Sequence, residues 1–98
     1  MKKVKLANML GKQLKIRPMA KRIDYTRGEL PPIDFWWRVA SASPDKLQLL
    51  NPSTSHILNI GTDHVREYRT DPDGSDGFLI LKSQVTLRGP EIIVEPLL

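Results

Sequence analysis

Cysteine is absent from the 98 residues of this chain. Without thiols the chain can form no disulfide, no cysteine-ligated zinc site and no thiol nucleophile. Long apolar runs are lacking as well, because lysines interrupt the first segment, MKKVKLANMLGKQLKIRP, throughout. We therefore expect neither an export signal nor a membrane span, and we expect a cytoplasmic location.

The chain is also too short for two hydrophobic cores. We expect a single β domain over residues 12–96, preceded by a flexible basic arm over residues 1–11. A domain of this size has little room for a two-lobed cleft. We therefore expect a protein that is not an enzyme and that needs no cofactor.

Acidic residues are scarce in the first third of the chain. Residues 1–30 contain nine lysines and arginines but only two acids, whereas residues 31–98 contain six basic residues and nine acids. The net charge of +4 therefore comes from the N-terminal segment. Such a segment attracts phosphate or anionic lipid, or acts only as a solubilising arm.

Short segments with alternating apolar and polar residues follow one another between turn signals, and no long helical pattern occurs. Strands are predicted over residues 12–17, 35–42, 46–51, 56–60, 62–70, 77–87 and 91–95. The polar, proline-containing stretch over residues 19–34 is predicted to be a long loop. The predicted fold is mainly β, either a small antiparallel meander or a partly open SH3-like barrel.

The segment DPDGSDGF (residues 71–78) offers carboxylates at alternate positions, as a calcium loop does. Counted from Asp71, however, position six is Asp76 rather than glycine, and position twelve is Lys82 rather than glutamate. Asp73 and Gly74 form a preferred pair for a tight hairpin turn. We therefore predict a mobile, unliganded turn between two antiparallel strands.

His56, Asp63 and His64 are the other conceivable metal ligands, but a third strong ligand is missing from the local sequence. The sequence indicates no nucleophile beside either histidine. We predict structural roles, with His56 pairing across strands and Asp63 capping a bend. No metal is expected.

Basic residues gather in the segment that precedes the two tryptophans. Basic grooves with aromatic platforms bind single-stranded nucleic acid through charge neutralisation and base stacking. Because adjacent strand residues face opposite sides, one tryptophan points inward, and the sequence leaves open whether Trp36 or Trp37 is exposed. Candidate contacts to nucleic acid or another anion are Lys12, Lys15, Arg17, Lys21, Arg22, Arg27 and Trp36. The alternative is a solvated basic tail without a ligand.

Three segments, GKQLKIRPMAKR, STSHILNIGTDHVREYRTDP and GFLILKSQVTL, together resemble a family of small uncharacterised bacterial proteins. The resemblance covers about residues 11–95 and implies a bacterial source but no activity. The positions that fit the family pattern are Arg17, Pro18, Arg22, Trp37, His56, Gly61, Asp63, His64, Asp71, Pro72, Gly77, Phe78 and Leu79.

The function that we expect is that of a non-enzymatic binding or accessory module. Small strand-rich domains expose sheet edges that can accept an added strand from another protein. Protein–protein interaction is therefore the first hypothesis. Nucleic-acid binding through the basic segment and an exposed aromatic residue is the alternative.

Overall fold

The computed structural model describes residues 6–25, 27–70 and 77–97. Within these ranges the chain forms strands and two short 3-10 turns, so the predicted mainly β fold is confirmed. The strands are β1 (Gln13–Arg17), β2 (Ala20–Ile23), β3 (Trp37–Ala42), β4 (Lys46–Leu50), β5 (Ile57–Gly61), β6 (Val65–Thr70), β7 (Gly77–Leu81), β8 (Ser83–Arg88) and β9 (Glu91–Pro96). The 3-10 turns are η1 (Leu6–Met9) and η2 (Thr62–His64).

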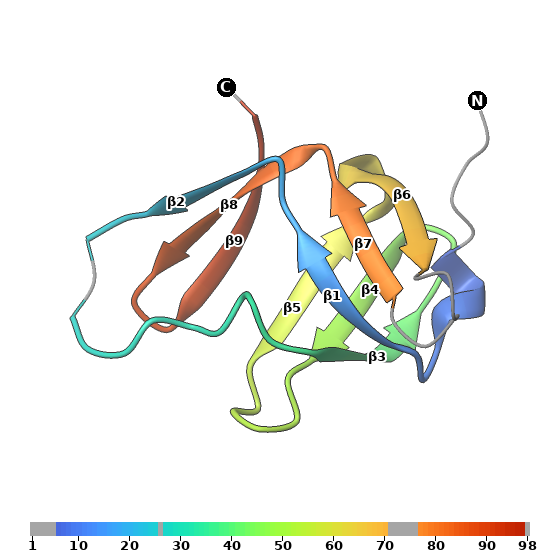
Figure 1. Cartoon of the computed structure of the whole chain (residues 1–98), viewed down its shortest axis with the longest axis horizontal. Coiled ribbons are helices and arrows are strands. Elements are labelled where there is room, and N and C mark those ends of the chain that lie inside the picture. The colour runs from blue at the N-terminus through green and yellow to red at the C-terminus, as the bar shows by residue number, and fades with distance from the viewer. Residues whose placement is uncertain (1–5, 26, 71–76, 98) are drawn as a thin grey trace.

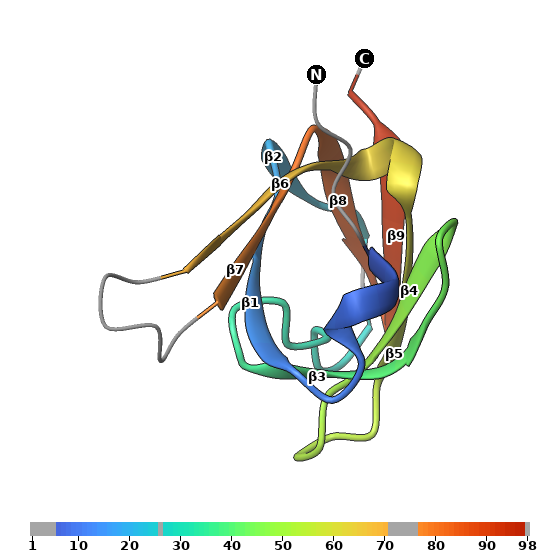
Figure 2. The ribbon, with the colours of Figure 1, turned by 90° about the vertical axis from the view of Figure 1, so that its right-hand side faces the viewer.

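The strands form a six-stranded sheet, in the order β5-β4-β3-β1-β7-β6, and a three-stranded sheet, in the order β2-β8-β9. Figure 1 shows β1 and β7 in front of β4 and β5, and Figure 2 shows these pairs on opposite sides of the interior. The larger sheet thus curls around the core, but the sheets do not close into a barrel.

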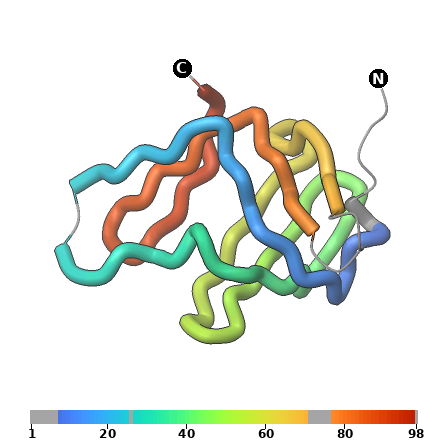
Figure 3. Tube along the Cα trace, viewed as in Figure 1, coloured from blue at the N-terminus to red at the C-terminus, as the bar shows by residue number. Residues whose placement is uncertain are grey.

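Two parallel pairings distinguish this topology from an antiparallel meander. β1 pairs with β7 in the larger sheet, and β2 pairs with β8 in the smaller sheet. Both connections turn at the same place, where the Met19 N–H donates a hydrogen bond to the Ser83 carbonyl at 2.9 Å. The two chain segments therefore pass from one sheet to the other side by side, as the tube in Figure 3 shows. The predicted single strand over residues 77–87 is accordingly divided at Lys82.

Alternating apolar residues from both sheets fill the core. In β7 and β8 four alternating apolar residues, Leu79, Leu81, Val85 and Leu87, are all buried. They pack in one cluster with residues from β1, β3, β4 and β5, which include Leu14, Ile16, Trp37, Val39, Leu47, Leu49, Leu58 and Ile60. This alternation leaves the opposite side of each strand free for other side chains.

The hairpins are where the turn signals predict them. Ser43 N–H donates to the Lys46 carbonyl at 3.0 Å in the turn between β3 and β4. β6 and β7 pair antiparallel with Thr70 opposite Gly77, so the predicted chain reversal between them is confirmed. The turn itself, residues 71–76, lies outside the described residues, and so does the predicted mobility of its aspartates.

Two parts of the chain differ from the prediction. The expected loop over residues 19–34 contains β2, whose side chains are largely exposed on both faces and so produce no apolar alternation. In the expected arm, Met9 is buried in the core, and Gly11 adopts a positive φ of 83° that suits glycine. The Gly11 N–H donates to the Val39 carbonyl at 2.9 Å, which connects this segment to β3.

Candidate functional site: a basic–aromatic face on the larger sheet

The outer face of the larger sheet positions the candidate site. In β1, Leu14 and Ile16 are buried, so Lys15 and Arg17 project away from the core. The same alternation directs further side chains outward from the neighbouring strands. They are Phe78 and Ile80 from β7, Glu67 and Arg69 from β6, and Arg38 from β3. The strand register then places Lys15 and Arg69 on either side of Phe78.

Cations lie over aromatic rings on this face. Lys15 Nζ is 4.9 Å from the centre of the Trp36 ring. Arg17 Cζ is 4.2 Å from the centre of the Phe78 ring. The electron-rich faces of the rings attract these cations at such distances, which positions the charges without a carboxylate. Both aromatic residues are partly exposed.

We use the name basic–aromatic face for Lys15, Arg17, Arg38, Arg69, Trp36 and Phe78. Arg69 forms an ion pair with Glu67, with 2.7 Å between Nη2 and Oε1. Among the described residues, no carboxylate pairs with Lys15, Arg17 or Arg38. Such an excess of positive charge on an exposed sheet attracts anions, and above all a chain of phosphates.

The structure divides the seven predicted contact residues among different sites. Lys15, Arg17 and Trp36 belong to the basic–aromatic face. Lys12 lies elsewhere, with its Nζ 5.3 Å from the ring centre of Tyr68, which packs against the core. Trp36 is thus the partly exposed tryptophan, whereas Trp37 is fully buried.

The other three predicted residues belong to the smaller sheet or to the loop that follows β2. Lys21 Nζ forms an ion pair with Asp34 Oδ2 at 3.3 Å. Arg27 Nε donates a hydrogen bond to the Tyr25 hydroxyl at 3.3 Å. Arg22 is exposed on β2. These cations are therefore not part of the basic–aromatic face.

Sequence reasoning missed Arg38, Arg69 and Phe78 as members of the site. The alternation of the strand after Phe35 already placed Arg38 on the same side as Trp36. No local pattern, however, indicates that β7 lies next to β1, because 59 residues separate the two strands. The parallel pairing of these strands is what brings Phe78 to Lys15.

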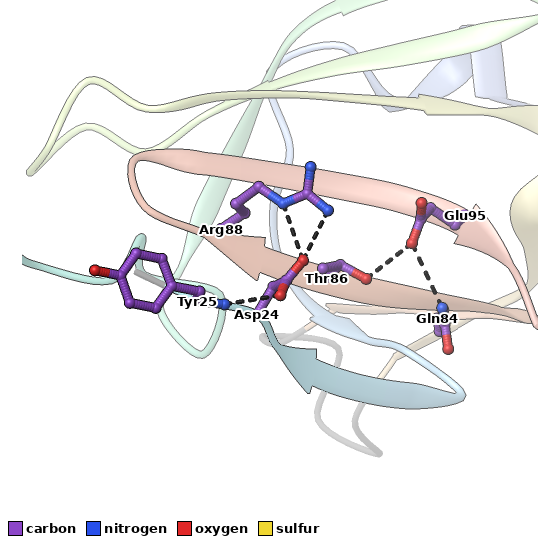
Figure 4. Close-up of polar contacts among 6 residues, drawn as sticks. All are labelled: Asp24, Tyr25, Gln84, Thr86, Arg88 and Glu95. Carbon is purple, nitrogen blue, oxygen red and sulfur yellow. Dashed lines mark hydrogen bonds and ion pairs between the residues drawn. The ribbon is translucent and has the colours of Figure 1, made fainter. Parts of the chain in front are cut away.

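The smaller sheet has a polar cluster around Asp24 (Figure 4). Arg88 Nε and Nη2 donate to Asp24 Oδ2 at 3.0 and 2.7 Å, and the Tyr25 backbone N–H donates to Asp24 Oδ1 at 2.8 Å. The Tyr25 N–H and, second to it, Arg88 lower the pKa of Asp24 below its ordinary value, because both favour the charged carboxylate. This cluster ties the end of β2 to β8.

A second cluster in Figure 4 joins β8 to β9. Glu95 Oε2 accepts hydrogen bonds from Thr86 Oγ1 at 2.8 Å and from Gln84 Nε2 at 3.4 Å. Thr86 is buried, and this bond satisfies its hydroxyl. The arrangement stabilises the sheet.

The structure places a hydroxyl beside one histidine, which the sequence did not indicate. His64 Nδ1 and Ser83 Oγ form a short hydrogen bond. Only 3% of Ser83 is exposed, so a substrate cannot approach its oxygen. The pair instead connects η2 to the corner between β7 and β8, where the Lys82 N–H also donates to the His64 carbonyl at 3.0 Å.

The remaining candidate ligands also have structural surroundings. The His56 carbonyl accepts a hydrogen bond from the Asn51 N–H at 3.0 Å, which is the predicted pairing across the hairpin. No side-chain cap is found at the start of η2, so the predicted capping role of Asp63 is wrong; Thr62 Oγ1 instead donates to the Pro44 carbonyl at 2.8 Å. In the part of the chain that the structure describes, no three His, Asp or Glu side chains gather as metal ligands.

No family model, curated protein or solved structure matches this chain. The resemblance to small bacterial proteins and the SH3-like topology therefore stay predictions. Among the described residues, none belongs to a helix that is long and apolar enough to cross a membrane.

Proposed function

We propose that this protein is a non-catalytic module that binds single-stranded nucleic acid through the basic–aromatic face. The observation that carries the proposal is the placement of Lys15 over Trp36 and of Arg17 over Phe78 on one exposed sheet. Phosphates would contact the cations, and unstacked bases would stack on the partly exposed rings. We further propose that the protein acts in the cytoplasm, as its lack of cysteine suggests.

The shape of the sheet favours a single strand over a duplex. The larger sheet curls around the core, so its outer surface is convex (Figure 2). A rigid duplex would meet a convex surface over few phosphates, whereas a flexible single strand can follow the surface. Bases in a duplex are also stacked on each other and cannot stack on Trp36 or Phe78.

The experiment is a fluorescence-anisotropy titration with a labelled 12-nucleotide single strand at several salt concentrations. We compare the wild type with the double variant Lys15→Gln/Arg17→Gln. The logarithm of the association constant falls as the logarithm of the salt concentration rises, and each lost phosphate contact should make this slope about 0.7 less steep. The slope of the double variant should therefore be about 1.4 less steep than that of the wild type. A duplex of the same length should bind more weakly than the single strand.

The control is the double variant Lys46→Gln/Lys82→Gln, which removes the same charge from exposed positions outside the basic–aromatic face. We expect this variant to retain the wild-type slope. Equal losses in both double variants would show that net charge alone attracts the strand. No salt-sensitive binding by the wild type, even at low ionic strength, would refute the proposal.

Protein–protein interaction, the first hypothesis from the sequence, is the second candidate. Protein–protein interaction is favoured by a different surface, where an apolar pocket lies beside the open edge of β2. The two candidates do not exclude each other, because the surfaces belong to different sheets.

A further inference from the structure

A mainly apolar pocket of about 780 Å³ opens between β2, the turn that joins β8 to β9, residues 29–35 and the loop before β5, and its polar lining includes Lys21, Glu29 and Asp34. Its apolar lining includes Ile23, Leu30, Pro31, Pro32, Phe35 and Leu87. Leu87 is buried at the base, whereas 59% of Ile23, 37% of Leu30 and 65% of Phe35 are exposed. The pocket is therefore a continuation of the core that opens to solvent, and its volume suits a large side chain or several smaller ones.

β2 forms one wall of this pocket and is also an edge strand. It pairs with β8 on one side, and among the described residues no strand pairs with its other side (Figures 1 and 2). The Asp24 N–H donates to the Leu87 carbonyl in β8 at 2.9 Å. Because strand residues alternate, the N–H and C=O groups of Lys21 and Ile23 point away from β8. These backbone groups are open to a further strand.

The same two residues face the pocket with their side chains. Lys21 and Ile23 line it, and the parallel register places Ile23 beside Leu87 on the inner side of the smaller sheet. A strand added to β2 would therefore receive backbone hydrogen bonds and would direct every second side chain into the pocket. We propose that β2 and this pocket bind an extended segment of a partner protein in which apolar and acidic residues alternate.

Charge selects this occupant over a second copy of the chain. Antiparallel pairing of two β2 strands through their open edges, with Lys21 opposite Ile23, would place Arg22 opposite Arg22 of the second copy, and like charges in that position are destabilising. Among the described residues Arg22 has no ion pair, and it lies on the outer side of the smaller sheet. An acidic residue of the added strand would lie beside Arg22, while its apolar neighbours would enter the pocket beside Ile23.

The probe is a capped, fluorescently labelled peptide, Ser-Val-Glu-Val-Glu-Val-Ser, titrated with the full chain. We expect the amide resonances of Lys21 and Ile23 to shift in two-dimensional NMR spectra, because their N–H groups gain acceptors. Replacement of Ile23 by serine should weaken binding about tenfold, since one buried apolar side chain contributes roughly that much. Ile57→Ser is the matched control, because Ile57 is 57% exposed on β5, outside the pocket. It should bind the peptide as the wild type does.

A modified peptide and a protein variant separate the contribution of backbone hydrogen bonds from that of charge. The same peptide with every amide N-methylated should lose binding, because it offers no backbone donors. In the Arg22→Glu variant, preference should switch from the Glu peptide to its Lys counterpart.

Several results would overturn the proposal. One is the absence of shifts at Lys21 and Ile23 up to millimolar peptide, and another is undiminished binding of the N-methylated peptide. A third is a concentration-dependent dimer in which the same amides shift without peptide, because the occupant would then be a second copy. None of these results bears on nucleic-acid binding, which uses the other sheet.

Discussion

β1 and β2 are consecutive short basic strands, yet they offer ligands different chemical groups. β1, with the sequence QLKIR, has strands on both sides, so its backbone groups are engaged and only its side chains are available. β2, with the sequence AKRI, has one neighbour, so its backbone is available on the other side. Position within the sheet, rather than composition, decides which groups can bind a ligand.

The charged residues of the two strands also differ in the groups that they contact. On β1, Lys15 and Arg17 lie over aromatic rings and keep their positive charge for a ligand. On β2, Lys21 is paired with Asp34, and the adjoining Asp24 is paired with Arg88. The basic N-terminal third is therefore divided between a surface suited to anions and a surface suited to an extended peptide.

The largest predicted effect is on the free energy of unfolding, because a buried residue of β1 and an exposed residue of β2 should contribute very differently to it. Leu14→Ala in β1 should lower the free energy of unfolding by about 2–5 kcal/mol, because Leu14 is fully buried. Ile23→Ala in β2 should change it by about 0.5 kcal/mol or less, because Ile23 is mostly exposed. Urea unfolding of both variants measures the difference. Similar losses in both would mean that β2 is buried in solution.

The aromatic residue beside β1 should have the next largest effect, this time on nucleic-acid binding. Trp36→Ala should weaken binding of the single strand by about 1–3 kcal/mol, the typical contribution of one stacked base. Tyr25→Ala is the control, since Tyr25 follows β2 and is 76% exposed. An equal loss with Tyr25→Ala would place the strand near β2 instead.

The corner between the two sheets should contribute less. Ser83→Ala removes the hydrogen bond to His64 at the corner between β7 and β8. At this corner the chain passes from β7, which pairs with β1, into β8, which pairs with β2. We expect a loss of about 0.5–1.5 kcal/mol in urea unfolding, the usual range for one hydrogen bond. The exposed Ser41→Ala in β3 should be nearly neutral. If both variants are neutral, the His64 contact does not stabilise the corner.

The smallest predicted effect is on the pKa of Asp24, which directly follows β2. The pKa of Asp24 is lowered on folding, so its contribution to stability is present above the ordinary pKa of 3.8 and is lost as pH falls through the lower folded value. Arg88→Gln should raise the pKa of Asp24, while the Tyr25 N–H keeps it below the ordinary value. An NMR titration of the Asp24 carboxyl group measures both shifts. An unchanged pKa in Arg88→Gln would mean that the ion pair does not persist in solution.

The sequence predicted most strands because their core residues alternate. The alternation of Leu79, Leu81, Val85 and Leu87 continued through the corner at Lys82, so it revealed the burial but not the change of sheet. β2 was missed because an edge strand exposed on both faces needs no apolar pattern, and its hydrogen bonds to β8 involve only the backbone.

Part of the candidate site was predictable for the same reason. Lys15, Arg17 and Trp36 were identified from charge and from aromatic residues close to them in sequence. Phe78 and the apolar pocket were not, because both depend on segments that are distant along the chain. Ser83 beside His64 is a further case of a contact that no local spacing indicates.

The sequence by itself determined the fold class, the buried face of most strands and the concentration of positive charge near the N-terminus, because these depend on local alternation and composition. Only the tertiary structure decided which cations share a surface, which tryptophan is buried and that β2 lies at a sheet edge beside a pocket. These features follow from the pairing of β1 with β7 and with β3, and of β2 with β8. Backbone hydrogen bonds form these pairings, and they are nearly independent of side-chain identity.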